Sequence, residues 1–153
     1  MNNRCLFKAQ RKNWQELPKD EQWVTGAIMY IENKCMMLIE DEDNLLRVQY
    51  PANKVWSADI YAIEVDESTL CQCTGLNDKN SNLIWENDIV ETQYGKAVVV
   101  WDKSEWRIKW IDDLIWRKDL HYWANDNSWR IEVIDNRFDN PELLESERNN
   151  ETD

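Results

Sequence analysis

The stretch Thr74–Glu91 reads TGLNDKNSNLIWENDIVE and carries the strongest structural signal in the chain. It packs turn-forming residues together and ends in two apolar runs, LIW and DIV, in a chain with only three glycines. The Asp and Asn side chains of residues 78–82 can bond their own backbone, which favours a tight turn. The stretch therefore predicts a turn that delivers two short strands into a sheet. We interpret it as a marker of the fold and not of an active site.

The residues that follow predict a meander of three antiparallel strands over residues 88–111. DIVETQY is the first strand, Gly95 supplies the turn, KAVVVW is the second strand, and WRIKWI returns after the turn DKSE. The last strand places apolar residues on one face, namely Trp106, Ile108 and Trp110. It places basic residues on the other face, namely Arg107 and Lys109. This alternation has the period of two that is typical of a strand.

The rest of the chain is also predicted to form short strands joined by turns. The expected strands are RCLFKAQR, QWVTGAIMYI, CMMLIE, LLRVQY and ADIYAIEV before the opening stretch, and SWRIEVIDNRF after it. Residues 112–126 show no clean pattern and predict short turns or an irregular strand. DNPELLESE predicts a short C-terminal helix, with Asn140 as its cap and Pro141 at its first position. Such spacing is typical of a compact, mostly β fold with short helical pieces.

The formal net charge is −12 and the isoelectric point is about 4.5. An acidic chain repels a phosphate backbone and an anionic membrane surface, so nucleic acid and membranes are disfavoured as partners. A small basic strip, Lys8, Arg11 and Lys12, is the feature that favours nucleic acid. The sequence has no window of 18 apolar residues and no apolar signal-peptide core, so we expect a cytoplasmic protein.

The sequence offers no set of catalytic or metal-binding residues. The cysteines at positions 5, 35, 71 and 73 and the single His121 lack zinc-ligand spacing, and we expect reduced, mostly buried thiols. Neither a phosphate-binding loop nor a nucleophile elbow is present. Acidic pairs, such as that at positions 112 and 113, arise by chance among 30 acidic residues. We therefore expect no enzymatic activity, no metal and no cofactor.

Tryptophan is the largest excess in the composition, with ten residues, six of them between Trp101 and Trp129. A domain of this size has difficulty burying so many large side chains completely. We expect most of them in the core and some on the surface, where tryptophan commonly anchors protein interfaces.

The segment TLCQCTGLNDKNSNLIWENDIV resembles the central signature of the YopX family, known from phages and prophages: T-x-x-Q-x-T-G-L-x-D-K-N-G-x-x-I-[FY]-E-G-D-I-V. The tail IEVIDNRFDNPELLE is similar to the ending of that family, E-V-I-G-N-[IV]-[YH]-[ED]-N-P-E-L-L. LFKAQRKN and QWVTGAIMYI are similar to its opening, so the resemblance spans about residues 5–145. The matching positions to which we assign a structural role are Thr74, Gly75, Leu76, Asp78, Lys79, Asn80, Glu86, Asp88, Ile89, Val90, Asn136, Asn140 and Pro141.

Three glycines of the family signature are replaced in this chain, by Ser81, Asn87 and Asp135. Asn and Asp are the non-glycine residues that best tolerate a left-handed backbone, so Asn87 and Asp135 are expected to keep a positive φ. Serine is a poorer replacement, and we expect Asn80 or Asn82 to take that conformation in place of Ser81.

The resemblance implies a mostly β fold whose second half is a small SH3-like barrel. We expect a single domain with an N-terminal β half over residues 5–73, a C-terminal half over residues 74–145, and a frayed tail over residues 146–153. The family implies no enzymatic activity.

Two functions then compete. The first is a non-catalytic accessory protein of a phage or prophage, in the bacterial host cytoplasm, that self-associates or binds a host or phage protein. The alternative is a protein that binds and sequesters a small nucleotide signal in phage–host conflict. This alternative predicts an aromatic-lined cavity near basic side chains, for which the candidates are Arg107, Lys109, Arg117 and Arg130. A nucleic-acid role through the barrel-like half ranks third.

Overall fold

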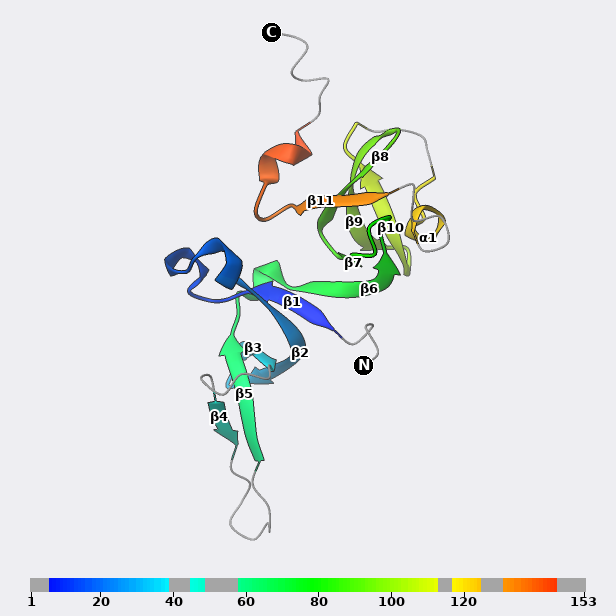
Figure 1. The fold of residues 1–153 in the computed structure, drawn as a ribbon. Coiled ribbons are helices and arrows are strands. Elements are labelled where there is room, and N and C mark those ends of the chain that lie inside the picture. Colours follow the sequence, from blue (N-terminus) through cyan, green and yellow to red (C-terminus); the bar gives the residue numbers. More distant parts are fainter. Residues whose placement is uncertain (1–5, 39–44, 49–57, 113–116, 125–130, 146–153) are drawn as a thin grey trace. The chain divides into compact units, whose positions relative to one another are not determined.

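A computed structural model describes residues 6–38, 45–48, 58–112, 117–124 and 131–145. The chain divides into two compact units, residues 4–71 and residues 72–153. Strands dominate both units and pair in antiparallel sheets, and the helical pieces are short (Figure 1). The expected mostly β fold is therefore confirmed.

The first unit is built on five antiparallel strands in the order β4-β5-β3-β2-β1. Their bounds are β1 Phe7–Gln10, β2 Trp23–Ile31, β3 Lys34–Leu38, β4 Leu45–Val48 and β5 Ala58–Glu64. Three short 3-10 helices join or follow them: η2 Trp14–Glu16, η3 Lys19–Glu21 and η5 Glu67–Thr69. The unit has its own core, made by Ala9, Val24, Cys35, Met37, Ile63 and Val65.

One glycine is required by the close approach of β2 and β3. Gly26 lies in register with Phe7 of β1, in the middle of β2. A Cβ at this position would lie 2.1 Å from the carbonyl oxygen of Leu38. Because no side chain fits at that distance, only glycine lets the two strands approach here.

The second unit contains the β6–β7 pair and a four-stranded sheet in the order β10-β9-β8-β11. The bounds are β6 Cys71–Asn77, β7 Leu83–Trp85, β8 Asp88–Thr92, β9 Gly95–Asp102, β10 Glu105–Trp110 and β11 Glu132–Asn136. The register runs without interruption from β8 through β9 to β10. The predicted three-stranded meander is therefore confirmed.

The predicted alternation along β10 places one of its faces in the core of the second unit. Ile108 and Trp110 are buried and Trp106 packs partly against them, while Arg107 and Lys109 belong to the opposite face. The buried members of this core are Ile84, Val90, Ala97, Val99, Ile108, Trp110, Leu120, Trp123, Ala124 and Ile131.

The expected small barrel does not close among the described strands. β10 and β11 are the edges of an open four-stranded sheet (Figure 1). The short helix α1, Leu120–Trp123, contacts β10 and contributes two buried residues to the core. A helical turn therefore covers part of the sheet where a barrel would need a further strand. The remaining parts of the ambiguous segment, 113–116 and 125–126, lie outside the described residues.

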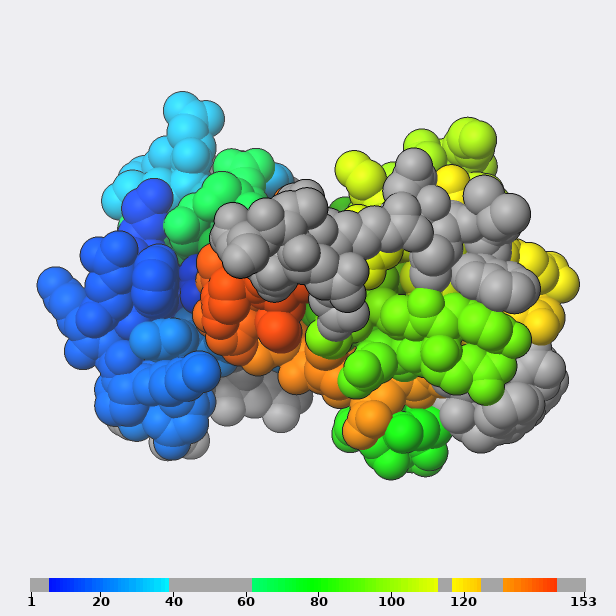
Figure 2. Space-filling model, turned by 90° about the horizontal axis from the view of Figure 1, so that it is seen from above, coloured from blue at the N-terminus to red at the C-terminus, as the bar shows by residue number. Residues whose placement is uncertain are grey.

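The C-terminal helix is present as a 3-10 helix, η7, over Pro141–Leu144. Pro141 occupies the first turn as expected, but Asn140 does not cap the helix with its side chain. The cap prediction was wrong, because the Asn140 side chain is oriented by a different bond, in which its Nδ2 donates to Asp135 Oδ2. Residues of η7 lie at the surface, in orange-red in Figure 2. The tail expected to fray, 146–153, lies outside the described residues.

Candidate functional site

Asp78 holds the turn of the opening stretch together. Its side chain is only 1% exposed, yet both carboxylate oxygens are satisfied by backbone N–H groups. Oδ1 accepts from Asn80 N and Asn82 N, each at 2.9 Å, and Oδ2 accepts from Val133 N at 3.0 Å. A buried carboxylate with three such donors orders the turn and ties it to β11.

The next two residues of the motif attach the same turn to the start of β11. Lys79 Nζ lies 3.0 Å from Glu132 Oε2, and Asn80 Nδ2 donates to Glu132 Oε1 at 3.2 Å. The backbone N–H of Lys79 also donates to the carbonyl of Ile131 at 3.0 Å. The D-K-N motif thus bridges segments about fifty residues apart in the sequence.

Polar residues elsewhere in the motif also bond to the backbone. Thr74 Oγ1 donates to the carbonyl of Ile84 at 2.7 Å. Asp88 Oδ2 accepts from Trp85 N at 2.8 Å, and Glu86 Oε1 accepts from the backbone N–H of residue 72 at 3.2 Å. Gly75 has a φ of 79°, within β6. The apolar motif residues serve the core: Ile89 and Val90 are buried, and Leu76 packs against the core.

Asn136 organises the chain reversal before η7. Its Oδ1 accepts from Phe138 N at 2.9 Å and from Asp139 N at 3.0 Å, and its Nδ2 donates to Asp139 Oδ2 at 2.9 Å. Asn140 and Pro141 follow this turn directly. The C-terminal motif therefore also bonds within its own segment.

Two of the three replaced glycine positions keep a positive φ. Ser81 has a φ of 64° and Asn87 a φ of 70°. The prediction for Asn87 is confirmed. The expectation that Asn80 or Asn82 would adopt the left-handed conformation in place of Ser81 was wrong. Asp78 accepts hydrogen bonds from the backbone N–H groups of Asn80 and Asn82, and Ser81 between them has the positive φ. Asp135 is not among the positive-φ residues; it lies at a register shift between β11 and β8, which re-aims the strand instead.

The β9–β10 hairpin carries a different kind of surface, a hollow of about 460 Å³ that we call the Trp101 hollow. Its charged and exposed aromatic lining residues are Trp101, Asp102, Lys103, Arg107, Lys109 and Lys118. Four basic groups and one acidic group give it a formal charge of +3, in a chain whose net charge is −12. This is the reverse of the chain's overall sign.

Local structure explains why these side chains converge. Lys103 and Ser104 both have positive φ and form a two-residue turn, since Asp102 and Glu105 are paired on either side. Arg107 and Lys109 alternate on the outer face of β10. Lys118 is brought alongside by a hydrogen bond from Ile108 N to its carbonyl at 2.8 Å.

Trp101 is the most exposed tryptophan among the described residues, with 56% of its surface accessible. Its ring packs edge-on against Trp106, with centroids 5.0 Å apart and an interplanar angle of 71°. The exposed ring is therefore held in place by a neighbour on the paired strand.

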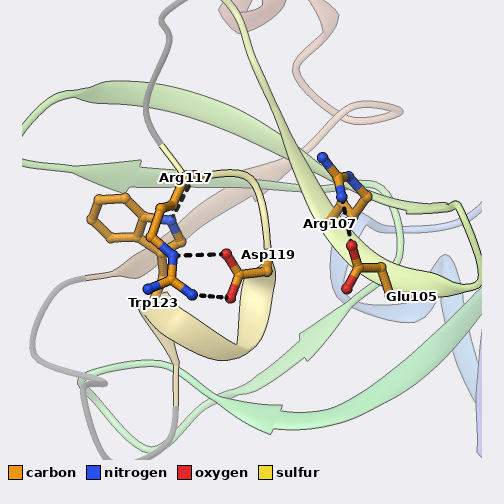
Figure 3. A network of polar contacts seen from close by, with 5 residues as sticks. All are labelled: Glu105, Arg107, Arg117, Asp119 and Trp123. Carbon is orange, nitrogen blue, oxygen red and sulfur yellow. Dashed lines mark hydrogen bonds and ion pairs between the residues drawn. The ribbon is translucent and has the colours of Figure 1, made fainter.

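Arg107 in the Trp101 hollow forms an ion pair with Glu105, whereas Arg117 is held elsewhere (Figure 3). Arg117 donates to both carboxylate oxygens of Asp119, each at 3.0 Å, and lies 4.1 Å over the ring of Tyr122. The hydrogen bond to Asp119 raises the pKa of Arg117 above its usual value. Arg117 is thus not among the residues that line the hollow. Arg130 lies outside the described residues.

A second hollow, of about 500 Å³, lies around the β8–β9 turn and is called the Tyr94 hollow. Its charged and exposed aromatic lining residues are Glu91, Tyr94, Lys96, Asp112, Glu142 and Glu145. Four acidic groups and one basic group give it a formal charge of −3. Tyr94 is 39% exposed and packs edge-on against Trp123, with centroids 6.0 Å apart.

Other chemistry is limited in the part of the chain that the structure describes. Cys35, Cys71 and Cys73 are reduced, buried thiols as expected, and burial raises the pKa of the Cys35 thiol; Cys5 lies outside the described residues. No group of three or more His, Cys, Asp or Glu side chains within those ranges could hold a metal ion. No helix there is long and apolar enough to span a membrane. Lys8 of the basic strip lies 5.3 Å from the centroid of the Trp23 ring.

Sequence reasoning found Arg107, Lys109 and the surface role of tryptophan, but it missed Lys103 and Lys118. Lys103 has a local signal, because the turn DKSE places it at the tip of a hairpin. Lys118 has none, since only the pairing of its segment with β10 brings it near.

Together the fold and the two hollows define an all-β protein whose polar motif supports the backbone and whose exposed aromatic side chains lie beside concentrated charge. The family model described as YopX protein matches residues 20–145, and the chain belongs to this family. A comparison with curated proteins finds no match.

Proposed function

We propose that this chain is a non-catalytic accessory protein of a phage or prophage, working in the bacterial cytoplasm by self-association or by binding a host or phage protein. The polar groups of the motif residues bond to the backbone and to neighbouring side chains, which supports a structural and non-catalytic role for the motif. The proposed contact surface is the β9–β10 hairpin.

The observation that carries this proposal is the exposure of Trp101. An aromatic ring that is 56% exposed and held edge-on by Trp106 presents apolar area at little cost in side-chain ordering. Tryptophan and arginine are the residue types most enriched at interface hot spots, and Arg107 lines the same hollow.

Native mass spectrometry of the purified chain, alone and after incubation with bacterial extract, tests this function. We expect defined species heavier than the 18.4 kDa monomer, which disappear in Trp101→Ala. Tyr30→Ala is the matched control, because Tyr30 is equally exposed at 58% but lies in the first unit. A chain that stays at 18.4 kDa under both conditions contradicts the proposal.

The second candidate function is sequestration of a small nucleotide signal. It is favoured by the presence of Arg107 and Lys109 beside Trp101 in one hollow of a size that suits such a ligand. Calorimetric titration with adenosine and guanosine monophosphates should give binding that is lost in Lys109→Glu. No heat of binding at millimolar nucleotide would exclude these probes as ligands.

A further inference from the structure

We propose that this chain assembles head to tail, with the Trp101 hollow of one copy against the Tyr94 hollow of the next. The inference rests on the proposed function and names its partner as a second copy of the chain. Both hollows are lined only by residues of the second unit, so the proposal involves one compact body.

The two hollows are complementary in charge, with formal charges of +3 and −3. The salt bridges among the described residues do not include Lys103, Lys109 or Lys118. They do not include Glu91, Glu142 or Glu145 either. Arg107 is already paired with Glu105, so these three lysines carry the excess positive charge of the Trp101 hollow. Charges of both signs that are not matched within one copy can be matched between copies.

Each hollow also contains an exposed aromatic anchor. Among the described residues of the second unit, the exposed large hydrophobic side chains are Tyr94 and Trp101, and one lies in each hollow. Trp123 and Trp106 hold these two rings edge-on, so little side-chain freedom remains to be lost on binding. An aromatic anchor within a charged rim is the arrangement of an interface hot spot.

The two aromatic anchors lie far apart along β9. Tyr94 precedes the first residue of β9 and Trp101 lies near its last. At the usual rise per residue β9 is about 23 Å long, so the two aromatic anchors lie toward opposite ends of that strand, although the linings of the two hollows meet at Trp110 and Ile111. A contact between different patches is heterologous, and it extends into a ring or an open chain of copies, whereas a two-fold dimer uses one patch twice.

Net charge favours this mode over other self-contacts. Two molecules that each carry −12 repel one another, so a contact that pairs local surfaces of opposite sign is favoured over one that pairs acidic surfaces. The Trp101 hollow is such a surface. A nucleotide would also suit its charge, but it would leave the Tyr94 hollow unused.

Charge reversal with recombination tests the proposal. One variant carries Lys103→Glu, Lys109→Glu and Lys118→Glu, and the other carries Glu91→Lys, Glu142→Lys and Glu145→Lys. By sedimentation velocity at low salt, we expect wild type to form oligomers that grow with concentration and dissociate as salt is raised. Each variant alone should be monomeric. Their equimolar mixture should form oligomers again, because each hollow of one variant then meets a hollow of opposite sign on the other: the unchanged pair, and the reversed pair at −3 and +3.

A matched control separates local from overall charge. Lys12→Glu, Lys19→Glu and Lys34→Glu together change the net charge by the same amount as the lysine variant, at exposed positions of the first unit, and should leave assembly unchanged. Circular dichroism of every variant checks that the fold is retained.

Three results would overturn the head-to-tail assembly. They are a wild type that stays monomeric at on the order of 100 µM, a two-fold dimer that neither reversal disturbs, and a variant mixture that stays monomeric. If wild type is monomeric but gains a partner from extract in a Trp101-dependent manner, this inference fails while the proposed function stands. If wild type is monomeric and gains nothing, both fail.

Discussion

Asp78 places a carboxylate at the centre of a turn, where both oxygens accept hydrogen bonds from backbone N–H groups. The residue is buried and bonds to both the turn and β11, so its carboxylate takes the place of water as the acceptor for three backbone N–H groups. Ser81 completes the same turn with a φ of 64°, a conformation that disfavours side chains with a Cβ. The opening stretch therefore combines one strongly stabilising residue with one strained residue.

Replacing Asp78 by Ala should lower the free energy of unfolding by about 3 kcal/mol, because buried donors lose a charged acceptor. Urea unfolding followed by tryptophan fluorescence measures this change. Asp102→Ala, at the exposed last residue of β9, is the control and should change it by less than about 0.5 kcal/mol. Similar values for the two variants would show that the Asp78 network contributes little.

Replacing Ser81 by Gly should raise the free energy of unfolding by roughly 0.5–1 kcal/mol, because glycine adopts a positive φ without a steric cost. The same denaturation experiment applies, with Ser81→Ala as control. Alanine keeps the Cβ and so should give no gain. A destabilised Ser81→Gly variant would mean that the serine side chain makes a contribution larger than the strain.

At the scale of elements, the strands whose sequence alternates with a period of two were predictable. Whether the sheet closes into a barrel was not. β10 followed from the alternation of Trp106, Ile108 and Trp110 with its basic residues, since that pattern is local. The open sheet was not predictable, because it depends on α1 packing against β10 from further along the chain. Asp135 was misjudged for a similar reason: a bulge against β8 took the place of a left-handed turn.

The candidate site shows the same limit. Arg107 and Lys109 could be named as neighbours from the sequence, because residues two apart on a strand share a face. Lys118 enters the Trp101 hollow only through a non-local bond to β10, and Arg117, one residue earlier, is held by Asp119. The order of neighbouring residues along the chain therefore does not indicate which basic group reaches the hollow.

A titration tests the link between β2 and η5. Tyr30 O–H donates to Glu67 Oε1 at 2.6 Å, and this hydrogen bond is the main cause that raises the pKa of Tyr30 from 10.0 to about 12. The neutral phenol is favoured in the folded state, so its contribution to stability is present below pH 10 and is lost as the pH rises toward 12. Absorbance titration of wild type against Tyr30→Phe isolates this group.

Glu67→Gln supplies the comparison for that titration. It should move the transition of Tyr30 back toward 10.0, because the charged acceptor is gone. A transition that stays near 12 in this variant would assign the shift to a different neighbour.

At the scale of the whole molecule, an acidic chain carries a basic hollow on a hairpin with an exposed tryptophan, and the residues of its family motif support the fold. The two roles are carried by different residues of the second unit. Conditions that change association should therefore leave the motif network unchanged, whereas loss of the network should weaken both.

Amide hydrogen exchange, followed as protein concentration is raised or a captured partner is added, tests this division most directly. We expect the amides of Asn80, Asn82 and Val133 to exchange slowly under every condition, since all three donate to Asp78. We expect the hairpin segment 100–104 to gain protection only on association. Protection that instead appears in the 78–82 turn, with none at the hairpin, would contradict the assignment of the motif to the fold and of the hairpin to binding.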